Sequence, residues 1–368
     1  VSMLRFLIVI LTLLTTIETQ AQVAEWADTD LQVREGLQLW LDASRVNAFR
    51  KSANDSELAS GTPVTSWPNA AAPKQRFEPP NENPKPKLIQ IGDSWVMRFD
   101  GEADHFRMVG SGVNLESATV LIVAAPHSNQ GDFRGFFASN APEQKDYESG
   151  FTIDLGPGPT LKFEQVNFER RGFGGARDML SAVYDFGTLH TIEAYIDRSM
   201  QEVRLRIDDG SREVRKLLPK EISFEQMTVG ARFVNNGPGA QHVHGPFHGD
   251  IAEILVYDRM LSEDEIKAVR RYLSSKYKKL EDELPTELPT ELPTELKLPA
   301  SGGKALVKAE NAPAIQMLQP GFSVREIPVE LTNVNNVRFR ADGKLVTLGY
   351  NGDIHLLSDT DGDGIEDE

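Results

Sequence analysis

Short apolar stretches separated by Gly, Pro, Asn and Asp fill the chain from Glu35 to the late 200s. Many short strands at this spacing are typical of an antiparallel all-β domain that buries its apolar faces between two packed sheets. The strands predicted on this basis are Leu37 to Leu41, Trp95 to Phe99, Ala118 to Ala125, Gly150 to Leu155, Thr160 to Phe163, Thr191 to Ile196, Glu202 to Ile207, Met227 to Ala231 and Ile251 to Tyr257.

Alternation within one strand predicts which of its faces is buried. From Thr191 to Ile196 every second residue, beginning with Ile192, is apolar. Successive side chains of a strand point to opposite faces of its sheet. We therefore expect one face in the core and the other face, which carries Glu193 and Tyr195, in solvent.

A single helix is predicted near the end of this domain, beginning at Ser262. Glu265 lies three residues later and completes a capping box, and apolar residues from Ile266 to Leu273 recur at helical spacing. We expect this helix to close the domain near Tyr277.

A repeat follows the helix. The sequence Glu-Leu-Pro-Thr occurs three times from Glu283 to Thr294. A proline at every fourth position prevents both a helix and strand pairing. Residues 281–299 are therefore predicted to form a semi-rigid spacer, with a reach of about 60 Å at roughly 3.1 Å per residue.

The last segment, residues 321–368, returns to a strand pattern. Turn signals separate four predicted strands, which are Ser323 to Ile327, Asn336 to Arg340, Leu345 to Leu348 and Ile354 to Leu357. This pattern predicts one β-propeller blade or part of one. A single blade cannot bury both of its faces, so we expect the sequence to be a fragment of a longer protein.

The N-terminus carries an export signal. Arg5 precedes the apolar run Phe6 to Leu14, and a polar stretch ending near Ala21 follows. This order is typical of a secretory signal peptide over residues 1–21, and the apolar run is too short for a permanent membrane span. We expect an extracytoplasmic protein, periplasmic or secreted, with no stable membrane span after signal removal.

Composition and net charge limit the classes of molecule that we expect the chain to bind. The 368 residues carry a net charge of −16, which repels nucleic acid and anionic lipid at long range and suits neutral sugars or cations better. Cysteine is absent, so disulfides, thiolate metal sites and covalent haem attachment are excluded for these residues.

Three segments resemble one family. Gly249 to Tyr277, which begins GDIAEILVYDRMLSEDEI, closely resembles the closing strand and helix of laminin-G-like, concanavalin-A-like domains in exported planctomycete-type proteins. Leu39 to Ala43 (LWLDA) and Met97 to Gly101 (MRFDG) resemble the opening strand and an early strand of the same domains. The resemblance covers residues 35–278. It implies an all-β fold, a two-sheet antiparallel jelly-roll sandwich with one C-terminal helix.

A second resemblance covers about 45 residues of the segment 321–368, and residues 328–353 carry it. Pro328 to Asp353 is similar to the first blade of propellers in large planctomycete-type proteins akin to sugar dehydrogenases. Any catalytic or cofactor-binding residues of that family would lie beyond Glu368. The resemblance therefore supplies no activity for the residues present.

Glycoside hydrolysis, which the same sandwich supports in other proteins, finds little support in the sequence. The best pair on one strand, Glu193 and Asp197, would be about 13 Å apart at roughly 3.3 Å per residue. Retaining enzymes need about 5 Å and inverting enzymes about 6.5 to 9.5 Å between their carboxylates. Glu253 and Asp258 are an odd number of residues apart and would point to opposite faces. No catalytic residue is predicted, although carboxylates from different strands leave hydrolysis open.

Two groups of residues have metal-ligand spacing. Asp359, Asp361, Asp363 and Asp367 alternate in a pattern suited to calcium, which makes calcium the one predicted cofactor. A solvated acidic turn explains the same pattern equally well. Two weaker candidates are better explained without a metal. The histidine cluster is explained by a polar loop and the acidic pair by a turn; the cluster is His242, His244 and His248, and the pair is Asp100 and Asp104.

Two features suit ligand binding. Trp67 precedes a proline in a predicted loop, so we expect it at the surface as a platform for a sugar ring, whereas Trp40 and Trp95 lie in strands and should fill the core. The run Arg170 to Arg177 (RRGFGGAR) could clasp an anion, but a flexible glycine loop between strands explains it as well.

These observations favour an exported, non-catalytic binding module that recognises a glycan or an extracytoplasmic protein and is tethered to a propeller. Two alternatives stay open. One is the N-terminal fragment of a propeller-type sugar or alcohol dehydrogenase-like protein, and the other is a structural assembly domain. Enzymatic activity is not expected of the residues present, and the sequence does not specify an oligomeric state.

Overall fold

A computed structural model describes the chain over residues 23–80, 84–173, 175–218 and 220–281. Near the C-terminus it describes 329, 331, 334–340, 342, 344–349, 352–361 and 366. The predicted signal peptide, nearly all of the predicted spacer and the predicted strand Ser323 to Ile327 lie outside these residues. The chain divides into two compact units, Val1–Leu292 and Pro293–Glu368.

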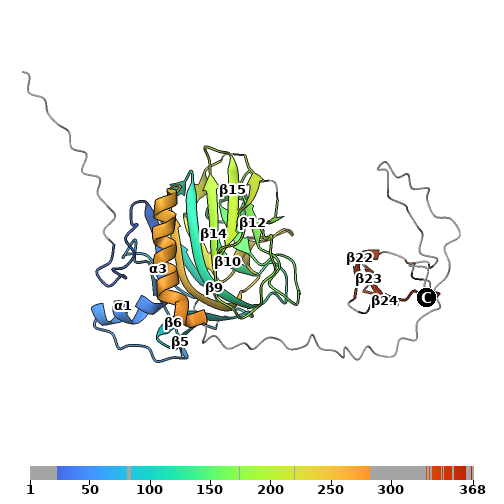
Figure 1. Ribbon diagram of the computed structural model, residues 1–368, viewed down its shortest axis with the longest axis horizontal. Helices are drawn as coiled ribbons and strands as arrows, with labels where there is room; N and C mark the ends of the chain where they lie inside the picture. Colours follow the sequence, from blue (N-terminus) through green and yellow to red (C-terminus); the bar gives the residue numbers. More distant parts are fainter. Residues whose placement is uncertain are drawn as a thin grey trace, which may run out of the picture. The chain divides into compact units, whose positions relative to one another are not determined.

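Two antiparallel sheets form the first unit (Figure 1). The large sheet has nine strands. In spatial order they are β16 (Glu213–Lys216), β15 (Glu202–Ile207), β14 (His190–Asp197), β9 (Ala118–Ser128), β21 (His248–Tyr257), β6 (Ser94–Asp100), β5 (Lys87–Ile91) and β2 (Thr62–Pro63), with β1 (Leu37–Asp42) paired to β21. The second sheet has six strands, in the order β13 (Arg177–Asp178), β12 (Asn167–Arg170), β11 (Phe151–Asp154), β10 (Gly135–Asn140), β18 (Gln226–Val229) and β7 (Phe106–Val109).

Smaller elements complete the unit. It also contains three two-stranded pairs, and they are β8 (Asn114–Leu115) with β17 (Ile222–Ser223), β19 (Arg232–Val234) with β20 (His242–His244), and β3 (Trp67–Pro68) with β4 (Arg76–Phe77). The helices are η1 (Ala43–Arg45), α1 (Val46–Ser52), α2 (Asp146–Ser149) and α3 (Glu263–Glu281). In the part of the chain that the structure describes, no helix is long and apolar enough to cross a membrane.

The predicted fold class, a two-sheet jelly-roll sandwich that ends in a helix, is confirmed. Eight of the nine strands predicted before residue 260 overlap strands of the two sheets. The segment Thr160 to Phe163 does not form a strand, because only Phe163 pairs, through an isolated bridge to Tyr184. Pro159 directly before it removes a backbone donor, which explains why the ladder does not extend.

The core between the sheets is formed mainly by apolar side chains. It is formed by the inward-facing half of each strand, and in the large sheet these residues include Leu39, Met97, Ile122, Ile192 and Ile254. Residues at alternate positions form a second apolar cluster on the other face of the large sheet. The large sheet is therefore buried on both faces, which explains why β9 and β21 are apolar along almost their whole length.

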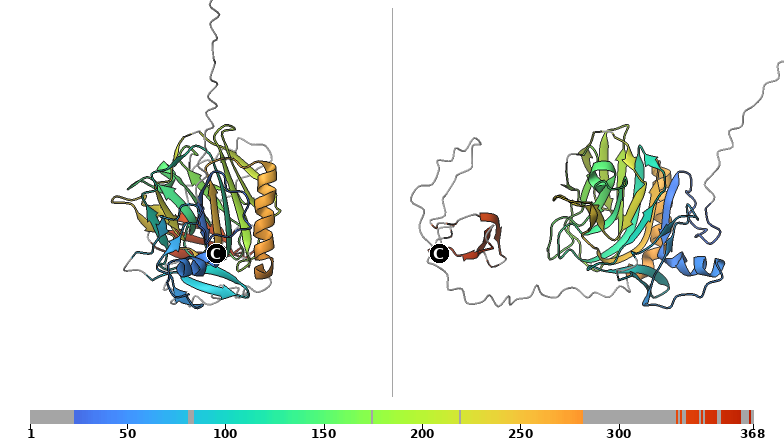
Figure 2. Two further views of the ribbon diagram at one scale, coloured as in Figure 1. Left: turned by 90° about the vertical axis from the view of Figure 1, so that its left-hand side faces the viewer. Right: turned by 180° about the vertical axis from the view of Figure 1, so that it is seen from behind.

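Helix α3 covers this second face (Figures 1 and 2). Its residues Ile266, Val269 and Leu273 pack into the cluster that contains Trp40 and Leu255 of the sheet. The capping box predicted at its start is present. The backbone N–H of Ser262 donates to Glu265 Oε2 at 2.8 Å, and the Ser262 hydroxyl accepts from the Glu265 N–H at 3.4 Å.

One prediction about β14 is wrong because α3 covers the outer face of this sheet. Glu193 and Tyr195 were expected in solvent, but both are about 1% exposed. Arg270 of α3 donates to both carboxylate oxygens of Glu193, and the Tyr195 hydroxyl donates to Glu193 Oε2 at 2.6 Å. The polar residues of the alternation thus face a helix that carries their partners.

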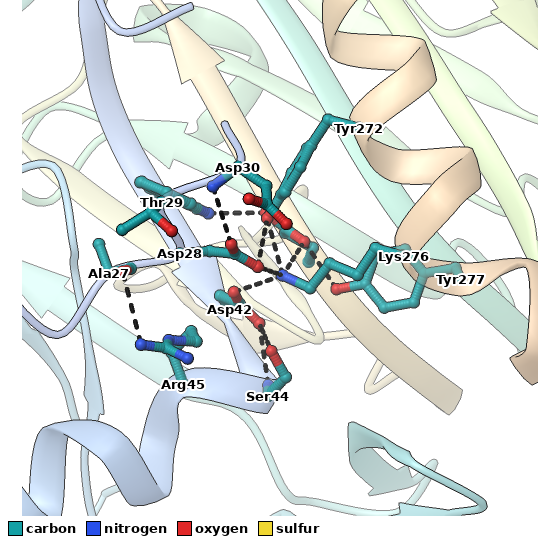
Figure 3. Close-up of polar contacts among 12 residues, drawn as sticks. Ala27, Asp28, Thr29, Asp30, Asp42, Ser44, Arg45, Tyr272, Lys276 and Tyr277 are labelled. Carbon is teal, nitrogen blue, oxygen red and sulfur yellow. Dashed lines mark hydrogen bonds and ion pairs between the residues drawn. The ribbon is translucent and has the colours of Figure 1, made fainter. Parts of the chain in front are cut away.

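A buried ionic network fastens the same helix to β21 and β1 (Figure 3). Glu253 accepts hydrogen bonds from Trp40 Nε1 at 2.7 Å, from the hydroxyls of Tyr272 at 2.9 Å and Tyr277 at 2.6 Å, and from Lys276 Nζ at 2.9 Å. Every oxygen of this carboxylate is therefore satisfied within the protein. Burial raises the pKa of Glu253 more than the charge of Lys276 lowers it.

Lys276 is the cation at the centre of this network. Its ammonium also bonds Asp42 and lies 3.2 Å from Asp28 Oδ2. Burial lowers the pKa of Lys276, but the charges of Asp42 and Glu253 outweigh burial and leave it above its ordinary value. One ammonium thus links carboxylates from the N-terminal segment, β1 and β21, which are far apart in the sequence.

Replacing Lys276 with Met should therefore destabilise the first unit strongly. The variant leaves Glu253 and Asp42 buried without their cation, and removing one partner of a buried pair typically costs about 3–5 kcal/mol. Urea denaturation of the full chain, followed by tryptophan fluorescence, measures the loss. Lys267→Met on the same helix, where the side chain is exposed, is the matched control and should leave the unfolding free energy unchanged. Equal stability of both variants would contradict the role given to the network.

Candidate functional site

A second buried ionic cluster joins strands of the second sheet to Arg232 of β19. The guanidinium lies 3.0 Å from Asp146 Oδ1, 3.1 Å from Asp154 Oδ2 and 2.9 Å from Glu169 Oε2. These carboxylates come from α2, β11 and β12. Burial lowers the pKa of Arg232, but its three anionic neighbours raise it above the ordinary value.

Three carboxylates around one guanidinium leave an excess of negative charge. Burial raises the pKa of Asp154 to about 7, although Arg232 lowers it, and burial also raises the pKa of Glu169. At a pH below about 7 we therefore expect this cluster to hold one proton. Its structural effect is to hold α2 against β11 and β12, since Asp146 also accepts from the Phe233 N–H at 3.1 Å.

An open pocket of about 400 Å³ adjoins α2 at the end of β12. We call it the Arg170 pocket, and its lining residues are Tyr147, Glu148, Arg170, Arg171, Gly172, Gly175 and Lys220. Three segments meet here, which are α2, the loop after β12 and the segment before β17. The Leu218 N–H donates to the Gly172 carbonyl at 2.8 Å and joins the last two.

Two glycines make this meeting possible. Gly150, which ends α2, passes so close to β10 that a Cβ atom would lie 1.9 Å from the Ser139 carbonyl oxygen. Gly172 has φ +81°, a conformation that side chains disfavour, and a Cβ there would lie 2.5 Å from the Leu218 carbonyl oxygen. The backbone on two sides of the pocket is thus fixed by positions that accept only glycine.

Arg170 is the unusual residue of the pocket. It pairs with Phe151 in the sheet and lies on the same face of β12 as Phe168, which is the core face. Its side chain is only 2% exposed. Its Nη2 donates to the Lys220 carbonyl at 2.6 Å, whereas Nε and Nη1 have no hydrogen-bond partner among the described residues. Burial lowers the pKa of Arg170 to about 10, so the group stays charged at neutral pH.

A second hollow, of about 600 Å³, borders the same loop and shares Gly172 with the Arg170 pocket. Its apolar lining includes Phe173, Leu217 and Leu218. Leu218 is 65% exposed, which is high for a leucine. We call this the Leu218 hollow. Together the two hollows offer cationic, hydrogen-bonding and apolar surface on either side of one short loop.

The structure places Trp67 differently from the sequence prediction. Trp67 was expected at the surface, but it is fully buried in β3, opposite Phe77 of β4 and edge-on to Phe106 with ring centroids 5.7 Å apart. The prediction is wrong because Trp67 and Pro68 pair with β4 instead of forming a free loop. Trp40 is buried as expected, and Trp95 is half-buried against the core.

The predicted metal ligands are only partly described. Asp359 and Asp361 are described, whereas Asp363 and Asp367 lie outside the described residues. Across the described ranges, no group of three or more His, Asp or Glu side chains is arranged to hold a metal ion. Calcium binding by the four aspartates stays a prediction.

The two weaker candidates from the sequence are also described. His242 and His244 share a face of β20, with ring centroids 6.4 Å apart, and His248 begins β21. Asp100 forms the expected turn, because its Oδ1 accepts from the Glu102 N–H at 2.8 Å. Burial raises the pKa of Asp104 in this turn to about 7.

Sequence reasoning did identify the segment that holds Arg170 but left its role open. A signal was present in the residue order: Phe168 is apolar, and Arg170 two positions later must share its face of the strand. No local signal linked Arg170 to Tyr147 or Lys220, because these residues meet only through the tertiary fold.

No protein-family model matches the chain, and none of the curated proteins compared with it matches. Solved structures with a similar arrangement of strands do exist. One is domain 4 of AbnA, a GH43 extracellular arabinanase from Geobacillus stearothermophilus, in complex with arabinotriose. It has a TM-score of 0.39 and 14% identity, over 62% of this chain and 96% of that one.

Two further structures are similar at the same level. The binding domain of botulinum neurotoxin DC, in complex with SialylT, has a TM-score of 0.42 and 11% identity over 65% of this chain and 51% of that one. The CBM40 of the Ruminococcus gnavus IT-sialidase, bound to sialyllactose, has a TM-score of 0.32 and 20% identity over 42% and 82%. The assignment of the fold rests on the strand pairing of the chain itself.

The raised pKa of Asp154 predicts a pH-dependent stability. Between its unfolded value near 3.8 and its folded value of about 7, the folded chain binds more protons than the unfolded chain. Stability is therefore greatest at the acidic end and falls as pH rises through 7, by up to about 1.4 kcal/mol per pH unit for one group.

Urea denaturation at pH 5 and pH 8 measures this loss. Asp154→Asn should flatten the pH dependence, because the amide mimics the protonated acid and its oxygen can still accept from the Gly156 N–H. Asp104 contributes a similar slope, which Asp104→Asn removes separately. A slope unchanged in Asp154→Asn would contradict the assignment to the Arg232 cluster.

Proposed function

We propose that this chain is an exported, non-catalytic module that binds carbohydrate through the Arg170 pocket and the Leu218 hollow. The observation that carries the proposal is the pair of open hollows beside one loop, lined by hydrogen-bond donors on one side and apolar side chains on the other. Binding sites for small molecules and sugars combine these two kinds of surface. The donors include Arg171 and Lys220, which are exposed at the rim of the pocket.

The rest of the sandwich supports this choice of site. The outer face of the large sheet is sealed by α3, and Glu193 and Glu253 there are bonded to cations of the helix. Asp154 and Glu169 are held by Arg232 in the same way. These buried carboxylates have structural partners, whereas the loop end of β12 is open and has polar groups without a partner among the described residues.

A glycan array probed with the full chain tests the proposal. We expect binding to a restricted set of glycans. Replacing both Arg171 and Lys220 with Ser should weaken that binding at least about tenfold, because it removes two charged donors, each worth about 1.5–3 kcal/mol. Arrays with calcium and with a chelator also test the calcium prediction for Asp359 and its neighbours.

The matched control removes two surface cations elsewhere. Lys267 and Arg271 line a hollow on the solvent side of α3, so their replacement with Ser makes the same change in net charge away from the proposed site. The control should bind as the unchanged chain does. A blank array, or equal loss in both double variants, would argue against a carbohydrate site at β12.

We further infer that the second unit is part of a propeller. Its strands β22 (Val334–Phe339), β23 (Leu345–Gly349) and β24 (Ile354–Leu357) form one antiparallel sheet. Val337, Phe339 and Ile354 are more than half exposed on it. Apolar side chains on an isolated small sheet need a covering layer, which a neighbouring blade would supply. Sequencing of the gene past the codon for Glu368 tests this, and a stop codon directly after it would contradict the inference.

A further inference from the structure

We infer that the Arg170 pocket takes the carboxylate group of an acidic sugar, and that the guanidinium of Arg170 is the group that recognises it. This inference rests on the proposed carbohydrate-binding function and names the class of sugar. It begins from a cation that the fold has buried at the edge of its core without a described counter-charge.

The nearest carboxylates in the sequence are engaged elsewhere. Glu169 precedes Arg170 but points to the opposite face of β12, where it bonds Arg232. Glu148 lines the pocket, but it is exposed and pairs with Lys145 at 3.2 Å. No ion pair joins Arg170 to any acidic side chain in the described part of the chain. Arg232 of β19, which is also buried, has three.

An unpaired buried charge is unfavourable, because its lost hydration is not replaced. Of the five N–H donors of the Arg170 guanidinium, the one on Nε and the two on Nη1 remain without a partner among the described residues. These atoms have almost no accessible surface, so the guanidinium must turn toward the opening of the pocket to meet an anion. A carboxylate or a phosphate, which has more than one oxygen, has the right shape to bind it there.

Two features favour a carboxylate over a phosphate. The net charge of −16 disfavours a multiply charged ligand, whereas a single negative charge faces a smaller long-range penalty. The pocket is lined by three cationic side chains and one acidic side chain, and these belong to Arg170, Arg171, Lys220 and Glu148. The pocket is thus a local basic site on an acidic protein, suited to one charged group on an otherwise neutral molecule.

The adjoining surface suits the neutral part of such a molecule. The Leu218 hollow begins at Gly172, on the other side of the same loop, and offers apolar side chains to the non-polar face of a sugar ring. A saccharide that places its carboxylate beside Arg170 would extend from the Arg170 pocket across Gly172. A neutral oligosaccharide that carries a single uronic acid residue has both the carboxylate and the neutral ring surface that this arrangement needs.

The experiment compares two ligands that differ only in charge. Calorimetric titration of the full chain with aldotriouronate, a trisaccharide with one uronic acid residue, and with its methyl ester, in calcium-free buffer, measures both affinities. We expect the acid to bind at least tenfold tighter than the ester. In Arg170→Met the affinity for the acid should fall about 30-fold, as expected when one partner of a buried charge pair is truncated, while the affinity for the ester stays the same.

Arg271→Met is the matched control, since Arg271 is an exposed arginine of α3 that lines a different hollow and its variant makes the same change in charge. It should leave both affinities unchanged. A thermal melt separates recognition from a structural role: without ligand, Arg170→Met should melt at the same or a higher temperature than the unchanged chain, because the variant removes an unpaired buried cation. If Arg170→Met does not fold, Arg170→Lys keeps the charge and should still weaken binding of the acid alone.

Several outcomes would overturn the proposed carboxylate site, and they differ in what they leave of the proposed function. Equal binding of acid and ester, or an acid affinity that Arg170→Met leaves unchanged, would overturn the carboxylate site while leaving the carbohydrate function intact. Glycan-array binding confined to neutral sugars would do the same. Binding of an acidic peptide such as oligoglutamate, without binding of any saccharide, would overturn both the sugar and the proposed function, as would a blank array.

Discussion

The contact between helix α3 and the outer face of the large sheet constrains the rest of the structure. This contact buries a second apolar cluster, and it also neutralises Glu193 and Glu253 with cations of the helix, Arg270 and Lys276. An uncovered sheet of this composition would expose both a broad apolar surface and carboxylates without partners. The helix is therefore part of the sandwich, and the face it covers is closed to ligands.

Because that face is closed, the surface considered for ligand binding lies on the second sheet and its loops. There Arg232 bonds carboxylates from three elements and so positions α2. Arg170 follows Glu169 on β12 but points to the opposite face, where it has no acidic partner in the described chain. Buried charge is paired at Glu193, Glu253 and Arg232, whereas at Arg170 the proposed ligand would supply the missing charge.

The sequence predicted the elements whose signals are local. Alternation and apolar runs located β9, β14, β15 and β21, and the Ser262–Glu265 capping box located the start of α3. It failed where a distant segment decides the environment. Glu193 alternates like a solvent-facing residue, yet Arg270 comes from 77 residues away to bury it. Trp67 is enclosed by pairing with a second short strand, and the pocket around Arg170 forms only when α2, the β12 loop and Lys220 meet.

An acidic protein with a basic pocket is less contradictory than its net charge suggests. Charges separated by more than about 8 Å are largely screened at physiological ionic strength, so distant carboxylates act weakly on a ligand that has reached the pocket. Within that distance the lining is cationic, and the low dielectric around Arg170 strengthens its attraction for a single negative charge. The net charge of −16 therefore acts mainly on the approach of extended polyanions, whereas the local residues determine which small charged group is retained. The net charge and the local lining together therefore disfavour polyanions and favour a ligand with one carboxylate.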